Sequence, residues 1–161
     1  MSRDYIGMQN PLPMPSRVFR LVAGKPVPPD LWAAAAVLLA PALAVSGTHE
    51  PDDVAAAVAV GDMQLWLADG LAIVTEIAVY PQLKALNFCF VGGEALRRQQ
   101  KASDADTPLS PAGETLLSAV SSFARRHGCR RLNGGGRAGW GRALEFDGWK
   151  KTTEYYKDFE K

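Results

Sequence analysis

The chain has 161 residues, of which 47% are hydrophobic and 22% are charged. This length and composition predict one domain with a real core, and a net charge of +1 argues against broad electrostatic binding of nucleic acid or of an anionic membrane. Two cysteines without a Cys-x-x-Cys pair and two distant histidines predict no metal site.

The first fifteen residues differ from the rest in composition. Pro11, Pro13 and Pro15 disfavour a helix and predict an extended arm over residues 1–15, followed by one domain over residues 16–161. Apolar side chains in the arm have little reason to remain in water, so we expect them to bind another subunit or a protein partner. They are Tyr5, Ile6, Met8, Leu12 and Met14. Packing of the arm on its own domain is the alternative.

After the arm, the chain predicts a strand and two helices. Arg17–Val22 alternates as a strand does, and Pro28-Pro29-Asp30 then begins a helix through the apolar run Leu31–Val45. A second helix is predicted over Pro51–Val60. The apolar run is too short for a membrane span, is interrupted by Pro41, and lacks the basic start of a signal peptide. We therefore expect a buried core helix, with no signal peptide or transmembrane segment.

Three antiparallel strands follow, separated by the turn signals Asp69-Gly70 and Pro81-Gln82. The predicted strands are Met63–Ala68, Leu71–Tyr80 and Lys84–Val91. Strict alternation in the third strand places Leu86, Phe88 and Phe90 on one face and Ala85, Cys89 and Val91 on the other. A strand that is apolar on both faces lies in the middle of a sheet and is covered on both sides.

The last third of the chain predicts a helix and then a glycine-rich end. Ser110 caps a helix that begins at Pro111 and ends at Gly128, with one apolar stripe along it. A short strand, a glycine-rich turn, a short helix and a closing strand are expected after it. Trp140 and Trp149 each follow a glycine, and we interpret both as structural residues.

This order of elements over residues 16–160, together with Gly-Arg-x-Gly-Trp at Gly136–Trp140 and the pair Gly148-Trp149, resembles the GNAT (acetyltransferase-like) fold. The resemblance is greatest to small GNAT-like proteins encoded by phages and prophages. It implies an α/β fold with a mixed, mostly antiparallel central sheet, helices on both faces and an extended N-terminal arm.

The resemblance also implies where a cofactor would bind. In enzymes of the superfamily, the turn after the fourth strand has the pattern Gln/Arg-x-x-Gly-x-Gly/Ala and holds the coenzyme A pyrophosphate on backbone N–H groups. The corresponding turn here is Val91-Gly92-Gly93, and these three residues are the cofactor-binding candidates. Glu94 stands where a phosphate would sit, and the spaced third small residue is missing.

Enzymes of this superfamily further require a general base and a general acid. Glu76 is the carboxylate within the central strands and is the candidate base; the alternative is an outward-facing residue on the pleat. At the position where the family usually has a tyrosine as general acid, this chain has the segment around Trp140, which cannot donate a proton. The general acid would therefore have to be Tyr155 or Tyr156. Adjacent strand residues face opposite sides, so at most one of these tyrosines can reach a cleft.

Two other patterns point away from nucleotides and nucleic acids. Gly134-x-Gly136-x-x-Gly139 matches a dinucleotide fingerprint, but too little chain follows it for a Rossmann sheet. The arginine pairs are not interleaved with aromatic residues, and we interpret them as solvated.

From these features we expect a GNAT-like scaffold with a degenerate acyl-coenzyme A site and no required cofactor. It would act through contacts with a protein partner or as a homo-oligomer. Its expected role is that of an accessory or virion-associated protein of a phage, located in the host cytoplasm or in the virus particle. The alternative is an N-acetyltransferase that transfers the acetyl group of acetyl-CoA to an amine.

Overall fold

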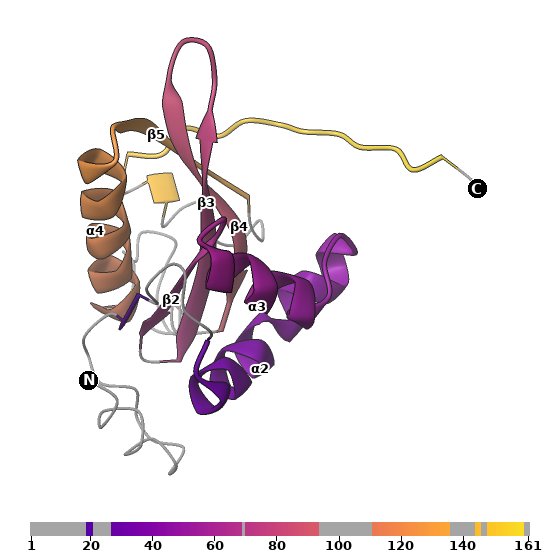
Figure 1. Cartoon of the computed structure of the whole chain (residues 1–161). Coiled ribbons are helices and arrows are strands. Elements are labelled where there is room, and N and C mark those ends of the chain that lie inside the picture. Colours follow the sequence, from indigo (N-terminus) through magenta and orange to yellow (C-terminus); the bar gives the residue numbers. More distant parts are fainter. Residues whose placement is uncertain are drawn as a thin grey trace, which may run out of the picture.

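A mixed sheet with strand order β1-β2-β3-β4-β5 forms the centre of the computed structural model (Figure 1). The structure describes residues 27–68, 70–93, 111–135, 144–145 and 148–159, together with the backbone of residues 19–20. The strands are β1 (Phe19–Arg20), β2 (Gln64–Ala68), β3 (Leu71–Val79), β4 (Lys84–Gly92) and β5 (Cys129–Gly134). Neighbours from β1 to β4 are antiparallel, whereas β5 runs parallel to β4.

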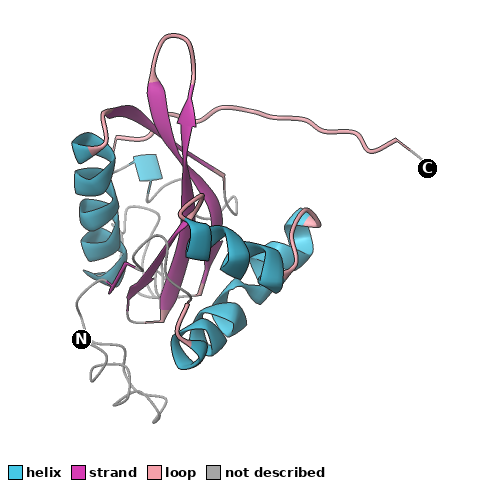
Figure 2. Ribbon diagram, in the orientation of Figure 1, coloured by secondary structure: helices cyan, strands magenta, loops and turns pink. Residues whose placement is uncertain are grey.

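Helices cover both faces of this sheet (Figure 2). Helices α2 (Pro29–Ser46) and α3 (Pro51–Val60) lie on one face, and α4 (Pro111–Arg126) lies on the other. Each face has its own apolar core, one built with α2 and α3 and one built with α4. The predicted α/β class, mostly antiparallel sheet and two-sided helix cover are confirmed.

Helix α2 is buried along one stripe only. Leu31, Ala35, Leu39 and Leu43 recur at four-residue spacing, and each is at most 4% exposed. The opposite side is open to solvent, where Val37 is 75% exposed. Among the described residues, α2 is the helix that is long and apolar enough to cross a membrane. The expectation of a buried core helix therefore holds for the stripe that packs on the sheet.

Strand β4 contains a bulge that the sequence did not indicate. Val74 of β3 pairs with Phe90 and Thr75 pairs with Phe88, so Cys89 is an extra residue on β4. The bulge turns the following side chains to the other face, and Phe90 packs with the α2–α3 core instead of the α4 core. The prediction that Phe90 shares a face with Leu86 and Phe88 is wrong for this reason.

Two further expectations fall at the ends of the chain. The prediction of a closing strand is wrong, because residues 148–159 form no strand. Lys150–Phe159 are exposed, and in Figure 1 they extend away from the domain. No described strand lies beside this segment to supply a hydrogen-bonded partner. The N-terminal arm lies outside the described residues, so the division at residue 15 stays a prediction.

Candidate functional site

The parallel strands β4 and β5 separate at the bulge. Their pairing runs from Lys84 opposite Cys129 to Phe88 opposite Gly134, and β4 then continues to Gly92 without β5 beside it. Ligands of open α/β sheets bind in the crevice at the carboxyl ends of parallel strands, so this is the candidate site. The crevice has a volume of about 30 Å³ and is lined by apolar side chains and two glycines. They are Ile73, Phe88, Val91, Leu117, Leu144 and Trp149, with Gly134 and Gly135.

Trp149 is one of the residues that line this crevice. Its ring meets Phe88 edge to face, with centroids 5.5 Å apart and planes at 88°. The backbone N–H of Trp149 donates to the carbonyl of Leu144 at 3.0 Å, which closes the local turn. A Cβ on Gly134 would lie 3.2 Å from Phe88 Cβ and 3.5 Å from the indole ring, so glycine makes room for both rings. Trp149 is a packing residue, as expected; Trp140 lies outside the described residues.

The two glycines of the β4 turn are required by packing. A Cβ on Gly92 would stand 1.9 Å from the carbonyl oxygen of Leu38, so α2 crosses β4 here at backbone contact. Gly93 has a φ of +107°, and its Cβ would stand 2.1 Å from the carbonyl oxygen of Gly70. These contacts explain Gly92 and Gly93 without a pyrophosphate. Residues 93–110 separate the end of β4 from the first residue of α4.

A row of polar residues crosses β3, β4 and β5 on the face of the sheet opposite the crevice. Glu76 of β3 pairs with Asn87 of β4, and Asn87 pairs with Asn133 of β5. The Asn133 side-chain amide donates to Asn87 Oδ1 at 3.0 Å. All three residues are half-buried. The structure thus places the candidate base Glu76 in one row with Asn87 and Asn133, two residues that sequence reasoning did not select.

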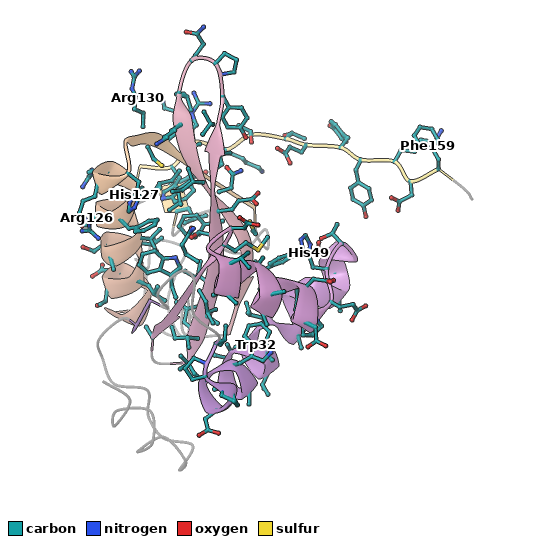
Figure 3. All side chains as sticks on the ribbon, viewed as in Figure 1. Trp32, His49, Arg126, His127, Arg130 and Phe159 are labelled. Atoms are coloured by element: carbon teal, nitrogen blue, oxygen red, sulfur yellow. The ribbon has the colours of Figure 1, made fainter. Side chains whose placement is uncertain are left out.

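Cys89 lies beside this row. Burial, together with the negative charge of the nearby Glu76 carboxylate, raises the pKa of Cys89 to about 12. The thiol therefore stays protonated at neutral pH and is a poor nucleophile. His49, in the loop between α2 and α3, packs edge on against Phe90 with ring centroids 5.3 Å apart (Figure 3). The bulge residue and this loop thus add a thiol and an imidazole to the face of Glu76.

A local signal for the polar row was present in the sequence. Asn87 interrupts a strand that is otherwise apolar, and asparagine is depleted in strands. Nothing local pointed to Asn133 or His49, because pairing between distant segments brings them to this face.

The other candidates are not brought to Glu76 within one chain. Tyr155 and Tyr156 are 92% and 88% exposed on the extended C-terminal segment, whose end is marked by Phe159 in Figure 3. Their role as general acid stays a prediction. The partner-binding candidates lie outside the described residues. They are Tyr5, Ile6, Met8, Leu12 and Met14.

Comparison with solved structures identifies the fold. A GCN5-related N-acetyltransferase from Ralstonia eutropha JMP134 superimposes with a TM-score of 0.59 at 13% identity, over 89% of this chain and 97% of that one. A Trypanosoma brucei acetyltransferase gives 0.59 at 9% identity, over 89% and 99%. The aminoglycoside acetyltransferase meta-AAC0020 from an uncultured soil metagenomic sample gives 0.58 at 9% identity, over 89% and 96%.

The chain has the GNAT-like fold. No protein-family model and no curated protein matches the sequence itself. At 9–13% identity, the likeness establishes the GNAT-like scaffold and leaves the chemistry to be argued from the site.

Proposed function

We propose that this GNAT-like protein works through protein contacts and does not transfer acetyl groups, because its acyl-coenzyme A site is degenerate. The observation that carries the proposal is Trp149, which packs on Phe88 in the crevice between β4 and β5. In this reading the protein is an accessory or virion-associated member of the phage type. The genes that flank it would test that origin.

The size of the crevice supports this proposal. About 30 Å³ remains beside Trp149. That is room for about two to three water molecules, at about 10–15 Å³ for each. Pockets for small molecules and cofactors measure about 300–1,000 Å³. An acyl-coenzyme A chain would therefore have to displace the indole and lose its contact with Phe88.

The turn after β4 supports it as well. Anion sites in proteins combine free backbone N–H groups with the start of a helix. Here the backbone of α2 packs directly against Gly92, and the backbone of the β2–β3 turn packs directly against Gly93. Glu94 follows directly in the sequence, and α4 begins only at Pro111. Among the described residues, no helix therefore begins directly after β4.

A thermal-melt experiment with acetyl-CoA tests the proposal. A ligand that binds only the native state at a hundred times its Kd stabilises by about 2.7 kcal/mol. For a domain of this size, that raises Tm by roughly 5–10 °C. We expect no such shift with acetyl-CoA, beyond any small change that adenosine diphosphate causes as a control for general anion binding. A shift of several degrees that is specific to acetyl-CoA would overturn the proposal.

The second candidate is an N-acetyltransferase that uses acetyl-CoA and acts on an amine. The row of Glu76, Asn87 and Asn133 favours it, because a half-buried carboxylate beside the parting strands is suited to take a proton from an amine. This candidate predicts that the protein releases coenzyme A in the presence of a suitable amine and that Glu76→Gln abolishes the release. Asp62→Asn, a change of the same kind at an exposed residue in the turn between α3 and β2, would be the control.

A further inference from the structure

The hairpin of β3 and β4 projects beyond the rest of the sheet (Figure 1). Strand β2 pairs with β3 from Leu71 to Thr75, whereas β4 pairs with β3 as far as Val79. Among the described residues, the side of β3 that faces away from β4 therefore has no partner strand after Thr75. We call the segment Glu76–Tyr80 the open edge.

The backbone of the open edge directs hydrogen-bonding groups away from its own sheet. The N–H of Tyr80 donates to the carbonyl oxygen of Leu83 at 2.9 Å, so it faces β4 across the hairpin turn. Along a strand, successive residues direct their N–H and C=O groups to opposite sides. Those of Ile77 and Val79 therefore point away from β4, where they can pair with an extended segment.

The side chains of the open edge do not protect it from such pairing. Natural sheets guard exposed edges with lysine, with proline or with a covering segment. Within the open edge the one charged residue is Glu76, and the β-branched Ile77 and Val79 and the aromatic Tyr80 are residue types enriched in strands. Val79 is 74% exposed and Tyr80 is 47% exposed. An unguarded edge with exposed apolar side chains is a site for pairing with another chain.

We propose that two copies of this chain pair at the open edge, antiparallel and with the two-fold axis at Ala78. In this register Ile77 lies opposite Val79 of the second copy, and Glu76 lies opposite Tyr80 of the second copy. The outward N–H and C=O groups of Ile77 and Val79 then bond across the interface in both directions. Because each copy uses the same segment, the pairing closes as a symmetric dimer.

The sequence of the open edge favours this register and a second copy as the occupant. Ala78 falls at a pair without mutual backbone hydrogen bonds, where Cα atoms approach to about 4.5 Å and small side chains fit. A shift of the axis toward Thr75 would bring the second copy against β2, and a shift toward Pro81 would place the hairpin turn in the pairing. The register at Ala78 also keeps the two Glu76 carboxylates apart, whereas like charges directly opposite each other are destabilising.

The pairing would add a residue of the second copy to the row of Glu76, Asn87 and Asn133. Glu76 and Tyr80 are separated by an even number of residues and therefore share a face of the strand. Residues directly opposite in an antiparallel pair also share a face. Tyr80 of the second copy would thus extend the row beyond Glu76 and bring a phenol hydroxyl to it. The pairing does not depend on whether acetyl-CoA binds.

Disulfide cross-linking tests the register on the full chain. Under mild oxidation we expect Ala78→Cys to form a covalent dimer, because Cα atoms about 4.5 Å apart lie within the range that a disulfide spans. Val79→Cys is the control, since its two copies would be offset along the pairing and lie beyond the limit of about 7 Å. Failure of Ala78→Cys to cross-link, or equal cross-linking of both variants, would overturn the proposal.

Light scattering after gel filtration measures the dimer without a cross-link. We expect the wild type to be a dimer, and we expect Val79→Lys to raise its Kd about tenfold or more, because each copy brings a lysine against Ile77 of the other. Val37→Lys, the same change at a valine of α2 that is 75% exposed, should leave the dimer unchanged. A monomeric wild type would overturn the proposal, and so would equal weakening by variants whose far-UV circular dichroism shows them folded.

A charge exchange tests whether Glu76 lies opposite Tyr80. Tyr80→Glu should weaken the dimer because it places two carboxylates together, and adding Glu76→Lys should restore it. The two positions are about 13 Å apart along one strand, so a rescue reports on a contact between copies. Absence of rescue would show that the open edge does not pair with itself in this register.

Discussion

Replacing Trp149 by alanine should destabilise the domain and enlarge the crevice. A fully buried tryptophan costs about 3–5 kcal/mol when truncated to alanine, and an edge-to-face pair contributes about 0.5–1.5 kcal/mol beyond area. Trp149 is half-buried, and its ring pairs with Phe88 at 5.5 Å. We therefore expect Trp149→Ala to lower the free energy of unfolding by about 2–3 kcal/mol.

Urea denaturation followed by circular dichroism measures this loss. Trp149→Phe keeps a ring against Phe88 and should lose less than half as much. A Trp149→Ala protein within about 0.5 kcal/mol of wild type, the range of ordinary surface changes, would refute the view that the indole packs in the crevice.

Three further tests concern residues of β4, α2 and the turn after β5. In urea denaturation, Gly92→Ala should cost about 1–3 kcal/mol because its Cβ meets backbone, whereas Gly135→Ala, which meets nothing within 4 Å, should be neutral. Leu39→Lys should unfold the domain and Val37→Lys should not, as thermal melts would reveal, because Leu39 is 0% and Val37 75% exposed. The pKa of Cys89 is raised from 9.0 to about 12 in the folded state, so the unfolded chain releases the thiol proton first as pH rises. The contribution of the protonated thiol to the free energy of unfolding is therefore complete below pH 9 and is lost between pH 9 and 12. Wild type should lose more stability than Cys89→Ala across that range, and equal losses would contradict the shift.

The elements with strong local signals could be predicted from the sequence. Helix α4 follows from its apolar stripe and its proline start, and the meander β2–β3–β4 follows from two turns between apolar runs. The bulge at Cys89 could not be predicted in this way, because alternation along one strand does not reveal an extra residue relative to its neighbour. The closing strand failed because strand propensity has no effect without a partner strand.

The candidate site was predicted less completely than the fold. Glu76 and the β4 turn were found because each carries a chemical signature in the sequence. The pairing of Asn87 with Asn133 and the packing of Trp149 on Phe88 both depend on the register of β4 against β5. That register is a property of the folded sheet and cannot be read from one segment. The local sequence signal for the polar row was Asn87, a polar residue within an apolar strand.

Calorimetric titration of the wild-type protein with acetyl-CoA tests the central claim most directly. A small crevice lined by Trp149 and a β4 turn whose glycines serve packing predict no saturable heat of binding up to millimolar ligand. Saturable binding in the micromolar range, at one acetyl-CoA per chain, would contradict the account and establish the crevice as a working cofactor site.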